Sequence, residues 1–126
     1  MLSEIKRLGF SIESHYSYLS TLGDKFRTTL LETIEYKDKG YPIYCIDFCP
    51  DATGQRLFIL SGSHGNEEAG LIAVERFIEF LDTVGEETNV AIRIVTPHNP
   101  VGTAMFSRYN GQGYDMNRDF AKKEYN

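Results

Sequence analysis

The chain has 126 residues, of which 41% are hydrophobic and 25% charged, and this predicts a single globular domain over 1–126 with one core. The 13 Lys and Arg against 18 Asp and Glu give a formal net charge of -5, which argues against a nucleic-acid partner. The opening MLSEIKRLGF carries a charge every few residues, so neither a signal peptide nor a membrane span is predicted. We therefore expect a cytoplasmic protein with no membrane partner.

The N-terminal third of the chain predicts a helix followed by a β-hairpin. In SIESHYSYLSTL, apolar residues recur at helical spacing after Ser11, a suitable N-cap, and Gly23 is expected to end the helix. Two stretches at 27–36 and 41–48 are rich in Thr, Ile, Tyr and Phe, and they flank KDKG. This pattern predicts a hairpin closed by a short turn that contains the glycine.

The only two cysteines, Cys45 and Cys49, fall in YPIYCIDFC, residues 41–49, which is predicted as a strand. Four extended residues would place them roughly 13 Å apart on one face of a strand, too far for a disulfide. We therefore expect two buried thiols, as in a reducing compartment.

The middle of the chain predicts a strand-helix-strand unit. RLFILS at 56–61 and VAIRIV at 90–95 are short apolar runs typical of buried parallel strands. Between them, apolar residues repeat at intervals of three and four from about Asn66 to Val84, which predicts an amphipathic helix, and VGEETN is expected to be a loop. The fold class is therefore α/β, with a β-hairpin leading into a mixed sheet on which helices pack.

The stretch from Thr96 onward, TPHNPVGTAMFSRYNGQGYDMNRDF, shows neither the helical nor the strand period. It mixes Pro, Gly and Asn with Arg and Asp. A loop of this length in a compact domain is usually functional or disordered.

The connection SGSHGNEEAG, residues 61–70, joins the first apolar strand to the helix. A phosphate-binding loop is excluded because no Lys followed by Ser or Thr is present. A nucleophile elbow is excluded because Ser63 has Ser61 rather than glycine two residues before it, and no acid and base partner is identified for it. The remaining candidates are His64 and Glu67, an H-x-x-E pair at the carboxyl end of a strand, where open α/β sheets bind ligands.

Imidazole and carboxylate are both good zinc ligands, and positions i and i+3 entering a helix can converge on one ion. Taken alone, the pair is a weak signal, and it is explained better by glutamates that favour a helix N-terminus beside a hydrogen-bonded histidine.

Together with NPVG at 99–102, Arg108 and DMNRDF at 115–120, the H-x-x-E pair resembles the zinc carboxypeptidase family of metallopeptidases. The resemblance includes the related succinylglutamate desuccinylase and aspartoacylase group. It implies the N-terminal portion of a carboxypeptidase-like mixed sheet, and a zinc cofactor with His64 and Glu67 as its first two protein ligands.

The same resemblance implies roles for the later residues. Asp115 would hydrogen-bond the far nitrogen of His64, and Arg108 would polarise the scissile carbonyl and stabilise the oxyanion. Asn117 and Arg118 would hold the free carboxylate of a substrate. Each residue type has a plainer alternative, since arginines are common in exposed loops and aspartates in turns.

Two histidines fall outside the family pattern. His98 precedes the N-P turn and has no transferable ligand role, so a structural role is expected. His15 lies on a predicted helix face without an acidic partner at ligand spacing, and we expect it at the surface or in packing.

The resemblance implies a zinc-dependent hydrolase that cleaves a C-terminal peptide bond, with an acyl-amino-acid amidohydrolase or a non-catalytic carboxylate-binding module as alternatives. The partner would be a peptide or acyl-amino acid with a free carboxylate. The family's third zinc ligand and general-base glutamate are expected beyond the D-x-N-R segment, so the chain alone should bind metal weakly and be inactive. An uncovered sheet edge is expected to cause self-association.

Overall fold

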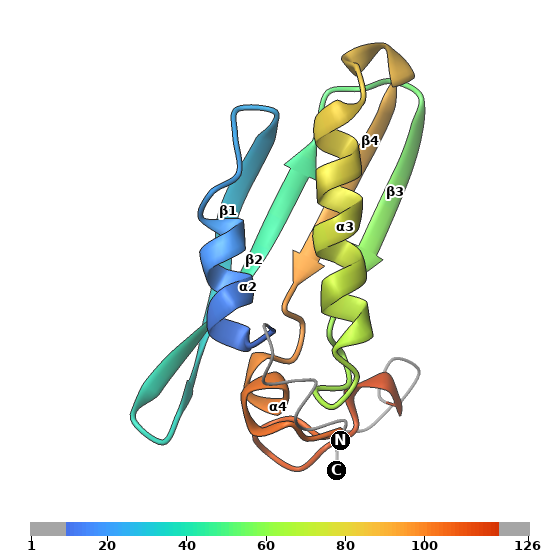
Figure 1. Ribbon diagram of the computed structural model, residues 1–126. Helices are drawn as coiled ribbons and strands as arrows, with labels where there is room; N and C mark the ends of the chain where they lie inside the picture. The colour runs from blue at the N-terminus through green and yellow to red at the C-terminus, as the bar shows by residue number, and fades with distance from the viewer. Residues whose placement is uncertain (1–9, 119–126) are drawn as a thin grey trace.

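The computed structural model describes residues 10–118, in which helices pack on one face of a four-stranded sheet (Figure 1). The elements are α2 (Ile12–Leu19), β1 (Phe26–Tyr36), β2 (Lys39–Phe48), β3 (Gln55–Leu60), α3 (Ala69–Thr83), the 3-10 helix η1 (Glu86–Thr88), β4 (Val90–Thr96), α4 (Pro100–Met105) and the 3-10 helix η2 (Met116–Arg118). The strand order is β1-β2-β4-β3. β2 is antiparallel to both β1 and β4, whereas β3 is parallel to β4. The predicted mixed α/β sheet is thus confirmed.

The core lies between the sheet and the two helices α2 and α3. Along α3, the residues Val74, Ile78 and Leu81 recur at intervals of four and three and point at the sheet. The cluster consists of Leu19, Phe26, Ile46, Phe48, Val74, Ile78, Leu81, Ile92 and Ile94. Burial of each large side chain contributes roughly 1.5 to 3 kcal/mol, so this layer fixes α3 and the loop before it. None of the helices in the described part of the chain is long and apolar enough to cross a membrane.

The hairpin turn differs from the predicted one. Lys37 and Asp38 form a two-residue turn with positive φ angles of 50° and 63°, the backbone that a type I′ turn requires. Gly40 lies within β2, so the glycine does not make the turn. A β-bulge interrupts β1 between Leu30 and Glu32.

Both predicted helices are shorter than their patterns suggested. Ser11 caps α2 as predicted, accepting from the Ser14 amide at 3.0 Å, but the helix ends at Leu19, before Gly23. Helix α3 begins at Ala69 instead of Asn66, because the preceding residues form a separate turn that packs against the loop after β4.

The stretch after Thr96 contains structure that the sequence pattern did not reveal. Asn99 caps α4 by accepting a hydrogen bond from the Gly102 amide, and Pro100 occupies the first helical position. Helix α4 has six residues, too few for a hydrophobic period to be recognised. The predicted VGEETN loop likewise contains η1.

His15 lies in packing, one of the two places predicted for it, and its acidic partner comes from a distant part of the chain. His15 is fully buried, with Nδ1 2.7 Å from Glu75 Oε2 and Nε2 2.9 Å from Thr96 Oγ1. Burial lowers the pKa of His15 even though Glu75 opposes the shift. The ring therefore ties α2 to both α3 and the end of β4.

The two cysteines are not joined by a disulfide, as predicted. Cys45 is buried on β2, and this burial raises the pKa of its thiol. Cys49 lies past the end of the strand with a φ of 47° and is only half-buried. The expectation of two buried cysteines on one strand face is therefore wrong for Cys49.

Candidate metal centre

Two loops meet at the carboxyl ends of the parallel strands β3 and β4. The His98 amide donates to the Ser61 carbonyl at 2.7 Å, and the Asn99 amide donates to the Gly62 carbonyl at 2.9 Å. Gly65 lies so close to the backbone of Gly102 that any Cβ on Gly65 would overlap with it. Only glycine allows the two chains to approach this closely.

The side chains of Asn99 and His98 strengthen the same contact. Asn99 is buried, its Nδ2 donates to the Ser63 carbonyl at 3.1 Å and its Oδ1 accepts from the Gly102 amide at 3.0 Å. His98 Nδ1 lies 2.9 Å from Ser63 Oγ, and burial lowers the pKa of His98. Ser63 thus has an imidazole partner, which the sequence reasoning did not find because the two residues are far apart in the chain.

The ring of His64 lies between two carboxylates. Its Nδ1 is 2.7 Å from Glu67 Oε2, and its Nε2 is 2.8 Å from Asp115 Oδ1. Both nitrogens can donate at once only in the doubly protonated imidazolium. The side chains of His64 and Asp115 are 10% and 15% exposed, whereas that of Glu67 is 64% exposed, so Nδ1 and Glu67 form the open side of the centre.

Asp115 is held from three directions. Besides the contact with His64, it accepts from Arg108 Nε at 2.9 Å and from the Asn117 amide at 3.0 Å. The hydrogen bond to His64, helped by Arg108 and the Asn117 amide, lowers the pKa of Asp115 to about 2. Asp115 is therefore an ionised acceptor at neutral pH, suited to fixing the orientation of the imidazole.

The structure joins four of the six predicted site residues, His64, Glu67, Asp115 and Arg108, by side-chain contacts. Asn117 and Arg118 are exposed on η2, where Arg118 Nη1 donates to the Asn117 carbonyl at 3.4 Å. Within residues 10–118, their side chains make no bond to the other four. The last two residues of DMNRDF lie outside the described residues.

The donors of His64 and Glu67 are of the types that zinc prefers. Two ligand atoms about 2.1 Å from a tetrahedral zinc ion lie about 3.4 Å apart, and Nδ1 and Oε2 are 2.7 Å apart here. The exposed Glu67 side chain is free to open this gap by rotating. Among residues 10–118, no group of three or more His, Cys, Asp and Glu side chains is arranged to hold a metal ion, so this pair fits zinc as part of a ligand set.

The H-x-x-E turn at the carboxyl edge of a mixed sheet, followed by the D-x-N-R segment, places the chain in the carboxypeptidase-like class of α/β proteins. The chain belongs to the family of the succinylglutamate desuccinylase/aspartoacylase catalytic domain, whose model matches residues 53–126, more than half of the sequence. A comparison with curated proteins gives no match.

Three solved structures share the fold. A candidate carboxypeptidase from Burkholderia mallei ATCC 23344 superposes with a TM-score of 0.74 at 19% identity, over 91% of this chain and 32% of that chain. Candidate metallopeptidases from Shewanella amazonensis SB2B and Shewanella denitrificans OS217 give TM-scores of 0.63 and 0.58 at 25% and 21% identity, each over 82% of this chain and 38% of that chain. The chain thus spans 32% to 38% of the length of these neighbours, and they confirm the predicted fold.

Proposed function

We propose that the chain carries the His64 and Glu67 part of a zinc centre that hydrolyses an amide bond beside a free carboxylate. The observation that carries this proposal is a chain of side-chain hydrogen bonds at the carboxyl edge of the sheet, which links Glu67, His64, Asp115 and Arg108 in that order. The family membership and the fold shared with candidate metallopeptidases support it. The activity belongs to the longer catalytic domain, of which the chain spans a part.

The residues have complementary tasks in this proposal. A bound zinc would act as a Lewis acid and would lower the pKa of a coordinated water. His64 offers Nδ1 as a ligand only while its proton sits on Nε2, and the ionised Asp115 favours that tautomer by accepting from Nε2. Arg108, held by Asp115 through Nε, supplies fixed positive charge for the developing oxyanion.

Two substrate classes satisfy this arrangement. The family description favours an N-acyl amino acid, because desuccinylase and aspartoacylase activities both concern such amides. The neighbour described as a candidate carboxypeptidase favours a C-terminal peptide bond. Both substrates present a free carboxylate, for which Asn117 and Arg118 are the candidate partners.

Zinc titration by isothermal calorimetry tests the metal site on the 126-residue chain. We expect weak binding that His64→Ala and Glu67→Ala abolish, and that Asp115→Asn weakens by about 10 to 100 fold. Glu79→Gln, on the exposed surface of α3, is the matched control and should bind zinc like the wild type. Equal binding by the wild type and His64→Ala would show that the proposed ligands are wrong.

A second assay addresses the reaction. The zinc-loaded chain is offered N-acetylaspartate, N-succinylglutamate and a blocked dipeptide, and we expect none to be hydrolysed because residues 10–118 offer no group of three metal ligands. Hydrolysis that disappears with His64→Ala would show that the chain is a complete enzyme. A non-catalytic carboxylate-binding module would instead retain these ligands after zinc is removed with a chelator.

A further inference from the structure

A turn at 110–114 precedes Asp115 of the candidate metal centre, and Asn110 closes this turn. The Asn110 amide donates to the Tyr114 carbonyl at 2.9 Å, and the Gly113 amide donates to the Asn110 carbonyl at 3.0 Å. Gly113 has a φ of 85°, a backbone conformation that favours glycine. The backbone of Asn110 is thus held at both its amide and its carbonyl.

The side-chain oxygen of Asn110 is held by two backbone amides of the same turn. Its Oδ1 accepts from the Gln112 amide at 2.9 Å and from the Tyr114 amide at 3.0 Å. Two N–H groups that converge on one carbonyl oxygen stabilise the negative charge that this oxygen gains when a nucleophile adds to its carbon. The turn therefore makes Cγ of Asn110 more open to attack.

The nearest nucleophile along the chain is the amide nitrogen of Gly111, from which attack on Cγ closes a five-membered ring. Asn110 and Gly111 form the single Asn-Gly pair of the sequence, and glycine has no Cβ to hinder the approach of its nitrogen. Within residues 10–118, neither the Gly111 amide nor Asn110 Nδ2 donates a hydrogen bond. Residues 111–114 are exposed in this chain, so water reaches the attacking nitrogen.

We propose that Asn110 is a site of spontaneous deamidation through a cyclic imide formed with Gly111. Hydroxide removes the proton of the Gly111 amide, and the nitrogen adds to Cγ while Oδ1 carries the negative charge between the Gln112 and Tyr114 amides. The bond from Cγ to Nδ2 then breaks, and Nδ2 takes up protons from water and leaves as ammonia. Water next opens the imide at either of its carbonyls, which gives aspartate or isoaspartate. The net reaction consumes one water and releases one ammonia, without oxidation or reduction.

The two products differ in their effect on the backbone. Aspartate adds a negative charge but leaves the path of the chain unchanged. Isoaspartate routes the chain through Cγ and so adds one carbon to the backbone between Arg108 and Asp115, of which Nε and Oδ2 lie 2.9 Å apart. The modification therefore changes the spacing along the chain of two residues of the candidate metal centre.

Peptide mapping by mass spectrometry tests the proposal on the folded 126-residue chain during incubation at mildly alkaline pH. We expect the peptide that contains Asn110 to lose the mass of ammonia and then to gain the mass of water. A methyltransferase specific for isoaspartate should label the same peptide. The internal controls are asparagines that are followed by residues other than glycine, namely Asn66, Asn89 and Asn99. They should keep their side-chain amides over the same period, and Asn99 in particular is followed by Pro100, which has no N–H.

Two variants test the route through the imide. Asn110→Gln would need a six-membered ring and should lose the conversion, whereas Gly111→Ala places a Cβ beside the attacking nitrogen and should slow it. A Cβ at position 111 would lie 3.1 Å from the Tyr36 side chain, so circular dichroism checks that Gly111→Ala is folded.

Retention of the Asn110 amide in the folded chain would overturn the proposal. If the amide were lost only after unfolding in guanidinium chloride, the fold would protect the site instead of promoting the reaction. Equal rates of conversion for the wild type and a folded Gly111→Ala would also overturn it, because attack by the neighbouring nitrogen would then not limit the reaction.

Discussion

Replacement of Gly65 by alanine should force apart the two loops that build the candidate metal centre. The new Cβ would come closer than 3.0 Å to backbone atoms of Gly102 and Thr103, and backbone cannot rotate out of the way as a flexible side chain can. Overpacking typically costs about 1 to 3 kcal/mol. Because the obstacle is backbone, we expect a loss at the upper end, about 3 kcal/mol.

The hydrogen bonds between the loops increase this cost. Separation of the two chains would stretch the bond from the Asn99 amide to the Gly62 carbonyl, now 2.9 Å, and that from the His98 amide to the Ser61 carbonyl, now 2.7 Å. Each contributes about 1 kcal/mol net. Loss of both would raise the total to about 5 kcal/mol, which is comparable with the stability of a small domain.

Urea unfolding followed by circular dichroism measures the effect as a change in the free energy of unfolding. The control is Gly23→Ala, because a Cβ at Gly23 meets no atom within 4 Å. Zinc titration of the folded variant should show weaker binding, since His64 and Asp115 belong to the separated loops. A loss below about 0.5 kcal/mol for Gly65→Ala, the range of ordinary surface substitutions, would refute the reasoning.

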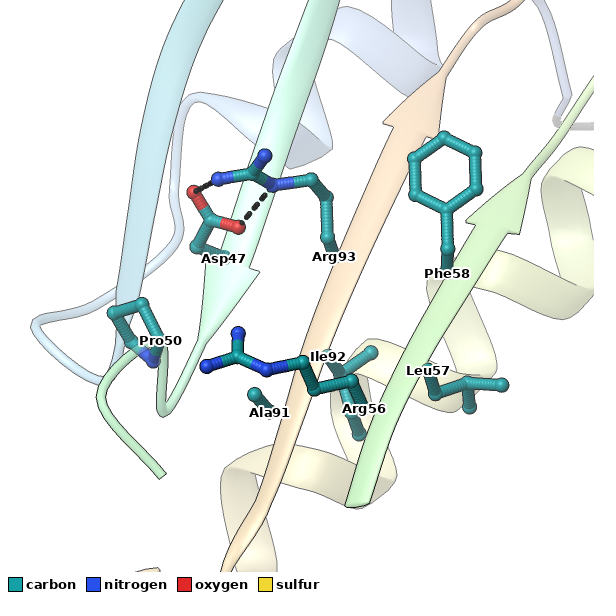
Figure 2. A pocket seen from close by; sticks show the side chains of 8 residues that line it. All are labelled: Asp47, Pro50, Arg56, Leu57, Phe58, Ala91, Ile92 and Arg93. Atoms are coloured by element: carbon teal, nitrogen blue, oxygen red, sulfur yellow. Dashed lines mark hydrogen bonds and ion pairs between the residues drawn. The ribbon is translucent and has the colours of Figure 1, made fainter. Parts of the chain in front are cut away.

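Two further predictions concern buried titratable groups and are measured by urea unfolding as a function of pH. His15→Leu leaves Thr96 and Glu75 without their partner, at a cost of about 1 to 3 kcal/mol near neutral pH. The folded-state pKa of His15 lies below 6.5. The contribution of His15 to the free energy of unfolding is therefore present above pH 6.5 and is lost as the pH falls through the folded-state pKa. If the free energies of unfolding of the wild type and His15→Leu changed in parallel with pH, the result would contradict this prediction. The pKa of Asp47 is lowered from 3.8, chiefly by its hydrogen bond to Arg93, so its contribution is present above pH 3.8 and is lost on further acidification. Because Arg93 is 56% exposed, Asp47→Asn should lower the free energy of unfolding by only about 1 kcal/mol. If the wild type and Asp47→Asn lost stability equally as the pH falls below 3.8, the result would argue against the ion pair that Figure 2 shows between Arg93 and Asp47.

The sequence correctly predicted the elements whose signals are local. The spacing of Val74, Ile78 and Leu81 predicted the face of α3 that packs on the sheet, and Ser11 predicted the start of α2. The family resemblance also rested on residues visible in the chain, such as His64 and Glu67. Side-chain periodicity and capping act within one or two helical turns, and for this reason they can be recognised without tertiary structure.

The predicted boundaries of helices are wrong where contacts with a distant segment compete with the local sequence signal. The helix pattern extends back to Asn66, but the contact between Gly65 and Gly102 holds this part of the chain in a turn, so α3 begins at Ala69. Helix α4 escaped prediction because its stability depends on Asn99 and on packing, and six residues show no period. Propensity is a weak prior that tertiary contacts override.

The sequence alone determined the class of fold, the residue types of the candidate centre and the order in which they occur. Only the tertiary structure decided that Asp115 reaches the ring of His64 across 51 positions, that His15 contacts Glu75 across 60, and that β4 lies between β2 and β3. Local propensities fix backbone conformation residue by residue. Contacts between distant residues depend on how helices and strands pack to bury their apolar faces, and a pattern read along one chain does not contain that information.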